Sequence, residues 1–176
     1  MMVNVLRPVR LRVPPVDGAG WIRVDAWATV IFVVVAVGGA AAPSVLGVAA
    51  AAVSILLFAV GCVVFLVAFL RGVDRSRTEE ISVAELFLLM GGVAPAVVRR
   101  WLLALLGVQI VVAVAVASIR PFTSLAFGIL APMFGLAIAG RWAAEYGSYR
   151  ARTVLRTKRT VTKAQPPVNE EGSSGA

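Results

Sequence analysis

Residues 26–70 read AWATVIFVVVAVGGAAAPSVLGVAAAAVSILLFAVGCVVFLVAFL and contain no charged side chain. As one α-helix this stretch would be about 68 Å long, twice the ~30 Å thickness of the hydrocarbon core of a bilayer. The stretch must therefore fold back once. Residues that end or interrupt helices lie near its middle, namely Gly38, Gly39, Pro43 and Ser44. We expect two transmembrane helices here, at about 24–42 and 46–70.

A second pair of uncharged stretches follows in the C-terminal half. Residues 101–119 and 122–140 are separated only by an Arg-Pro dipeptide at 120–121. Each stretch is long enough for one helical crossing, and we expect spans at about 95–119 and 122–142. Backbone groups in lipid must be satisfied within the spanning segment, which favours α-helices. The sequence thus predicts an all-α polytopic membrane protein with four transmembrane helices arranged as two hairpins.

The composition agrees with a membrane protein and argues against an enzyme. Of the 176 residues, 60% are hydrophobic without counting glycine and 15% are charged, against roughly 45–50% apolar and about 25% charged in soluble domains. The chain has no His, and Cys62 is its single cysteine. A disulfide framework, a zinc site and a Cys–His nucleophile pair are therefore excluded. We expect no catalytic residues, no metal and no cofactor.

Basic residues are concentrated in three segments that two hairpins would place on one side of the membrane. The segment before residue 24, the central segment 71–100 and the segment after residue 140 contain all but one of the 17 Lys and Arg residues. The exception is Arg120, between the third and fourth spans. Positive charge accumulates on the cytoplasmic side of membrane proteins. We therefore expect both termini and the central segment to face the cytoplasm.

The central segment also contains signals for a short helix. These are a capping-box pair, an apolar run and a glycine stop: Ser82, Glu85, 86–90, Gly91 and Gly92. A helix over about 83–90 is too short to cross a bilayer, so it should lie in the interface or against the bundle. We expect Leu86, Leu89 and Met90 to be buried there. Two roles remain open for this interfacial helix, covering the helix ends or docking a partner.

The other polar segments carry weaker signals. The run RGVDRSRTEE over 71–80 alternates in sign, which predicts local ion pairs in a solvated loop. The Pro- and Gly-rich head should be irregular up to an aromatic belt at Trp21 and Trp27. The tail is basic and then low in complexity, so we expect it to be mostly disordered and attracted to anionic lipid, with no need for nucleic acid as a partner. The expected division is a head, 1–23, a transmembrane domain, 24–149, and a tail, 150–176.

Two polar side chains stand out near the spans. Gln109 lies in the third span, where its amide needs a partner, either on another helix at about 0.6–2 kcal/mol or on a substrate. Arg120 directly follows that span and can reach lipid headgroups, an anionic lipid or a partner's carboxylate. We expect no Asp or Glu inside any span. This argues against a proton relay or a cation-coupled transporter.

The fourth span contains small or helix-breaking residues at regular spacing, namely Gly128, Pro132, Gly135 and Ala139. Such residues permit close helix contact, and a proline inside a span predicts a kink. The pattern fits packing inside the bundle and also a lateral docking face for another membrane protein.

Several short motifs lie between residues 65 and 140: the DRSRT run at 74–78, Arg99 and Arg100, Gln109, the turn at 120–122 and the PMFG run at 132–135. With these motifs the stretch resembles a family of small actinobacterial integral membrane proteins. The resemblance implies a plasma-membrane bundle that accompanies the permease-type subunits of a mammalian-cell-entry (Mce) lipid importer without catalysis of its own.

We therefore expect a non-catalytic accessory subunit of a larger plasma-membrane complex, of the Mce importer type by resemblance. The alternative is a stand-alone lipid-binding or transport protein that uses Gln109 and Arg120 around a cavity. Membrane lipids and an integral-membrane protein are the expected partners. The candidate partner or lipid contacts are Gln109, Arg120, Gly128, Pro132, Gly135, Ala139, Leu86, Leu89, Arg99 and Arg100.

Overall fold

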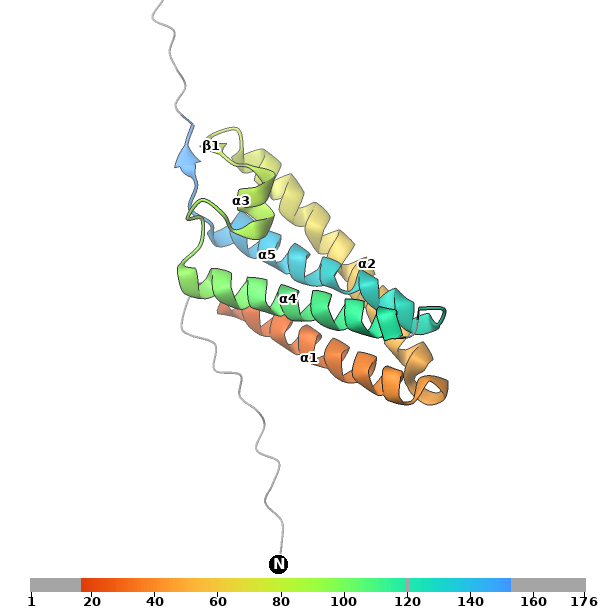
Figure 1. Ribbon diagram of the computed structural model, residues 1–176. Coiled ribbons are helices and arrows are strands. Elements are labelled where there is room, and N and C mark those ends of the chain that lie inside the picture. Colours follow the sequence, from red (N-terminus) through yellow and green to blue (C-terminus); the bar gives the residue numbers. More distant parts are fainter. Residues whose placement is uncertain (1–16, 120, 153–176) are drawn as a thin grey trace, which may run out of the picture.

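The computed structural model describes residues 17–119 and 121–152, whose long helices lie side by side (Figure 1). Its elements in chain order are α1 (Ala19–Ala41), α2 (Pro43–Arg75), β1 (Glu79–Glu80), α3 (Val83–Leu88), α4 (Ala96–Ile119), the 3-10 helix η1 (Ser124–Leu130), α5 (Pro132–Tyr146) and β2 (Arg150–Ala151). Within the described residues, α1, α2, α4 and the η1–α5 segment are long and apolar enough to cross a membrane. The predicted all-α fold is thus confirmed, and the chain is a multi-pass membrane protein.

The four spans form the two predicted hairpins. The turn between α1 and α2 is the single residue Ala42, and α1 runs straight through Gly38 and Gly39. Pro43 occupies the first position of α2, where its missing N–H costs nothing. The start of α1, the segment 76–95 and the end of α5 gather at one end of the bundle (Figure 1). We call this end the α3 end.

Three spans extend beyond their predicted limits at the α3 end, since α5 ends at Tyr146 rather than at 142 and both α1 and α2 are longer than expected. Helix α1 begins at Ala19 rather than at 24, directly after Gly18, which has a left-handed φ of 72°. The last residues of the expected head are therefore helical, whereas residues 1–16 lie outside the described part of the chain. Helix α2 continues to Arg75, so the first half of the sign-alternating run is helix rather than loop.

The fourth span changes helix type at the proline. Residues before Pro132 form the 3-10 helix η1, and α5 begins at Pro132. Proline lacks the N–H that would continue an α-helical ladder, and the N–H of Ala131 instead donates to Gly128 O at 3.1 Å. A kink was predicted at this position, and the structure shows a change of helix type there. A 3-10 helix as long as η1 is uncommon.

Helix α5 is the central element of the bundle, since it contacts α1, α2, α3 and α4. Small residues permit these close contacts. A Cβ atom added at Gly61 of α2 would lie 2.9 Å from the backbone nitrogen of Phe134, and one at Gly140 would collide with the ring of Phe87 on α3. Trp142 is buried and donates from Nε1 to the carbonyl oxygen of Asp17 at 2.9 Å. The small residues of the fourth span thus face neighbouring helices inside the bundle.

The capping box at the start of α3 is present as predicted. The N–H of Ser82 donates to Glu85 Oε2 at 2.9 Å, and the N–H of Glu85 donates to Ser82 Oγ at 3.2 Å. The helix ends at Leu88, and Leu89 adopts a left-handed φ of 50°. Because the helix ends before residue 90, Met90 is exposed rather than buried. The other two side chains that were predicted to be buried, Leu86 and Leu89, are buried.

A two-stranded antiparallel ladder at the α3 end was not predicted. Strand β1 pairs with β2 so that Glu79 faces Ala151 and Glu80 faces Arg150. The ladder fixes the first residues of the expected tail against the central segment. The predicted disorder of the tail concerns residues 153–176, which lie outside the described residues.

Candidate functional site

A cluster of polar side chains lies inside the bundle. Asp25 and Thr29 are four residues apart on α1 and therefore share one face. Gln109 of α4 donates from Nε2 to Thr29 Oγ1 at 2.7 Å and to Asp25 Oδ1 at 3.1 Å. Its Oε1 accepts the backbone N–H of Gly135 at 3.3 Å. We call these four groups the polar cluster. The predicted interhelical hydrogen bond of Gln109 is confirmed, and it joins three helices.

Gly135 makes the approach of Gln109 to α5 possible. A Cβ atom at this position would lie 2.7 Å from Gln109 Oε1, closer than real Cβ atoms approach an oxygen. The Gly135 N–H is in the first turn of α5, where the N–H groups lack intrahelical partners. Gln109 therefore acts as a helix cap supplied by a neighbouring helix.

Asp25 is the part of the cluster that sequence reasoning missed. Its side chain is 0% exposed, and its Oδ2 has no hydrogen-bond partner among the described residues. The expectation that no Asp or Glu lies within a span is therefore wrong. Asp25 is the second residue of the predicted span 24–42, and because α1 begins at Ala19, it lies in the second turn of the helix rather than at its edge. The available signal was the spacing of Asp25 and Thr29 on one helical face.

An acidic side chain inside a membrane bundle marks a candidate functional site. A buried polar group without a hydrogen bond costs about 1–3 kcal/mol, so it persists only where the surrounding structure holds it. The polar cluster offers a carboxyl group, a hydroxyl and an amide. No group of three or more His, Cys, Asp or Glu side chains that could hold a metal occurs in the described residues. The chemistry of the cluster is hydrogen bonding between helices.

A second polar centre lies at the α3 end around Arg75. Its guanidinium forms an ion pair with Glu79 at 2.8 Å and donates to the carbonyl oxygens of Ala144 and Gly147 at 3.1 and 3.0 Å. These oxygens lie at the end of α5, where a cation interacts favourably with the helix dipole. Arg75 also lies 4.9 Å from the ring centre of Tyr149. Burial raises the pKa of Tyr149 to about 12, although the charge of Arg75 lowers that pKa.

The two tryptophans of the expected aromatic belt have different surroundings. Trp27 is exposed on α1, as a belt residue would be. Trp21 is half-buried beneath Arg141, whose guanidinium carbon lies 5.0 Å from the ring centre. Arg141 Nη1 also lies 2.6 Å from Glu145 Oε2, as an ion pair rather than an aligned hydrogen bond. Trp21 therefore contacts α5 through Arg141.

The predicted contact residues fall into four groups. Six are buried in the bundle: Gln109, Gly128, Gly135, Ala139, Leu86 and Leu89. Pro132 is half-buried, Arg99 and Arg100 are exposed at the start of α4, and Arg120 lies outside the described residues. The docking face proposed for Gly135 and Ala139 is therefore wrong for this bundle, because both residues face its interior.

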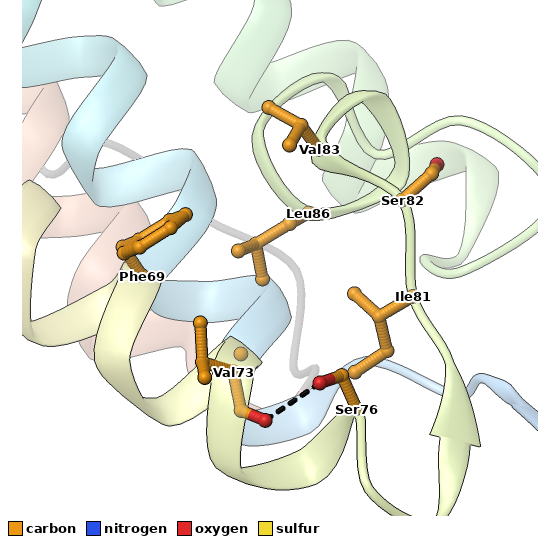
Figure 2. A pocket seen from close by; sticks show the side chains of 8 residues that line it. Phe69, Val73, Ser76, Ile81, Ser82, Val83 and Leu86 are labelled. Carbon is orange, nitrogen blue, oxygen red and sulfur yellow. Dashed lines mark hydrogen bonds between the residues drawn. The ribbon is translucent and has the colours of Figure 1, made fainter.

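Two neighbouring depressions lie on the surface of the α3 end. The first, the α2–α3 groove, has a volume of about 190 Å³ and an apolar lining from Phe69, Gly72, Val73, Ile81, Val83 and Leu86. Figure 2 shows it between α2 and α3, with the hydroxyl of Ser76 turned toward the carbonyl oxygen of Val73. The second, the ladder pocket, has a volume of about 430 Å³ and is lined by Glu80, Ile81, Ser82, Glu85, Arg150 and Arg152.

No family model, curated protein or solved structure matches the chain. The function of the chain is therefore inferred from its residues and from the geometry of the bundle.

Proposed function

We propose that the chain is a non-catalytic accessory subunit of a larger complex in the plasma membrane. The supporting observation is the outward face of α2. This helix has 33 residues and is about 50 Å long, against about 30 Å of hydrocarbon. Only 17% of its most apolar 18-residue stretch is buried, against 50% for the η1–α5 segment. Large apolar side chains remain exposed along it, among them Leu56, Val60, Val63 and Leu66.

Helix α2 contacts the bundle through one narrow side. Its buried positions are small residues, such as Gly61, Ala68 and Gly72, which bring its backbone close to α5 and α3. The opposite side can be covered by lipid or by the helices of another protein. The apolar character of this side does not distinguish the two covers, because lipid tails are as apolar as Leu side chains; close packing by the helices of a second membrane protein is the cover that we propose.

The resemblance of residues 65–140 to small actinobacterial membrane proteins directs the proposal to one kind of complex. That family includes LucB, an accessory subunit of the mycobacterial Mce lipid importer. A permease-type subunit of a lipid or fatty-acid importer is therefore the proposed partner. We also propose that the α3 end faces the cytoplasm, because the basic residues in the described part of the chain belong to the start of α1, the end of α2, the segment 76–95, the start of α4, the end of α5 and the segment 150–152, which lie at this end.

The decisive experiment is extraction of the full chain from native membranes in a mild detergent. We expect a large complex of fixed stoichiometry. Replacing Val63 on the outward face of α2 by Trp should remove the partner and leave the melting temperature of the bundle unchanged. The matched control is Val111→Trp, because Val111 is equally exposed but lies on α4 (67% against 64%). Isolation of the wild-type chain as a single small protein would contradict the proposal.

A second candidate function is that of a stand-alone lipid-binding or transport protein. The observation in its favour is the polar cluster, because the free Oδ2 of Asp25 is available to a ligand that enters the bundle. Proteoliposomes that contain only this chain would test it. Lipid uptake that depends on Asp25 would favour this function over the accessory role.

A further inference from the structure

The α2–α3 groove and the ladder pocket form one continuous surface. Ile81 and Ser82 line both of them, since these residues connect β1 to α3. One half of the surface is apolar and the other half is charged. A single ligand that spans both halves must therefore be amphipathic.

The apolar half is an open groove with a closed floor. Leu86 is buried and forms part of the lining, whereas Phe69, Val73 and Val83 are exposed along it. Gly72 leaves space for Leu86, because a Cβ atom there would lie 2.7 Å from Leu86 Cδ2. Figure 2 shows the side chains of Phe69, Val73 and Leu86 around this space. An extended hydrocarbon chain fits such a groove better than a polar group does.

The charged half contains groups of both signs. Arg150 and Arg152 are exposed, and neither forms an ion pair within the described residues. Glu80 is also exposed without an ion pair there. The carboxylate of Glu85 is different, because it accepts the Ser82 N–H in the capping box. The pocket therefore presents two available guanidinium groups and one available carboxylate. Guanidinium groups recognise phosphate oxygens, and a carboxylate pairs with an ammonium group.

The position of the surface selects a lipid among amphipathic ligands. The uncharged run of α2 ends at Leu70, and Arg71 follows it. Phe69 and Val73 thus lie where the apolar span meets its first charged residues. The apolar half of the surface adjoins the span, and the charged half lies beyond it on the β1–β2 ladder. This order matches a phospholipid, whose acyl chains lie in the membrane and whose headgroup lies outside it.

We propose that this surface binds one phospholipid with an aminated zwitterionic headgroup, phosphatidylethanolamine. An acyl chain lies against Phe69, Val73 and Val83 in the α2–α3 groove. The phosphate contacts Arg150 and Arg152, and the ammonium group pairs with Glu80. The site goes beyond the proposed accessory role and does not depend on it, because the lipid would bind to the chain whether or not a partner protein is present.

Native mass spectrometry of the full chain in detergent tests the proposal. The protein is mixed with phosphatidylethanolamine, phosphatidylcholine or phosphatidylglycerol carrying identical acyl chains. We expect one retained phosphatidylethanolamine per chain, and weaker retention of the other two lipids. Glu80→Gln should lower the preference for phosphatidylethanolamine over phosphatidylglycerol by up to about fivefold, the effect of one exposed ion pair. The double variant Arg150→Gln/Arg152→Gln should weaken retention of all three lipids.

Two further variants separate the site from general surface effects. Val83→Asn places a polar amide in the apolar half at an exposed position, so it should reduce lipid retention without unfolding the bundle. Arg77→Gln removes a positive charge at the same end but outside both depressions, and it should change nothing. Equal retention of the three lipids, preferred retention of phosphatidylglycerol, or no retained lipid would overturn the proposal. So would equal effects of Arg77→Gln and the double arginine variant.

Discussion

Replacing Gly135 by alanine tests the central contact of the polar cluster. The new methyl group would lie 2.7 Å from Gln109 Oε1, so either Gln109 or the backbone of α5 must move. If Gln109 moves, three interhelical hydrogen bonds weaken, each at about 0.6 kcal/mol in membrane proteins. If it stays, overpacking costs about 1–3 kcal/mol. Alanine recovers up to about 1 kcal/mol as the better helix former. We expect a net loss of about 1–2 kcal/mol.

Reversible unfolding in mixed detergent micelles, followed by circular dichroism, measures this loss. The matched control is Gly107→Ala, a helical glycine of α4 with open space where the Cβ atom would lie. That variant should be as stable as the wild type or up to about 1 kcal/mol more stable. The two substitutions are chemically identical, so their difference isolates the contact with Gln109.

A double-mutant cycle identifies the partner in this contact. In a Gln109→Ala background the amide is absent, so Gly135→Ala should lose most of its cost. A coupling free energy of about 1 kcal/mol or more is expected for residues in direct contact. Equal stabilities of the Gly135→Ala and Gly107→Ala proteins would refute the reasoning, and so would a coupling free energy near zero.

The remaining predictions concern the α3 end and the topology. Arg75→Gln should destabilise the bundle by about 1.5–3 kcal/mol in the same unfolding assay, because charged hydrogen bonds to Ala144 and Gly147 are lost; an unchanged stability would show that these bonds are not needed. The pKa of Tyr149 is about 12 in the folded protein, against an ordinary value of 10.0, so its hydroxyl should stay protonated until about pH 12. The stability that the protonated, buried side chain provides is therefore fully present below pH 10 and is lost as the pH rises from 10 to 12. A tyrosinate absorbance titration compared with Tyr149→Phe measures this, and ionisation near pH 10 in the folded state would contradict it. Cysteine probes at Ser76 and Ser173 in a Cys62→Ala background should not react with an impermeant thiol reagent in intact cells, and labelling of either would overturn the proposed orientation. Removal of residues 161–176 should leave membrane insertion intact, because this polar segment offers little apolar area to bury, and loss of the truncated protein from the membrane fraction would refute that expectation.

The sequence by itself determined the four spans and their hairpin arrangement. Each uncharged stretch is placed in lipid, which offers no hydrogen-bond partners, so the backbone N–H and C=O groups of the stretch must pair within it as a helix. This constraint acts locally. The capping box of Ser82 and Glu85 is equally local, because its two hydrogen bonds join residues three apart. The need of Gln109 for a partner was also evident, since an amide in an apolar span must be hydrogen-bonded. The identity of that partner was not evident.

The tertiary structure decided which residues meet across the bundle. Gln109 meets Asp25, 84 residues earlier in the chain, and Arg75 caps α5 through Gly147, 72 residues later. Such pairings stabilise the ends of helices at positions that local propensity does not mark. Arg75, the last residue of α2, also pairs with Glu79 of β1, whose partner strand β2 lies 71 residues later in the chain than β1. Small residues along the fourth span fitted both an internal and an external face in the sequence. Only the packing of α5 against α1, α2, α3 and α4 assigned them to the interior, because burial depends on segments that are distant in the chain.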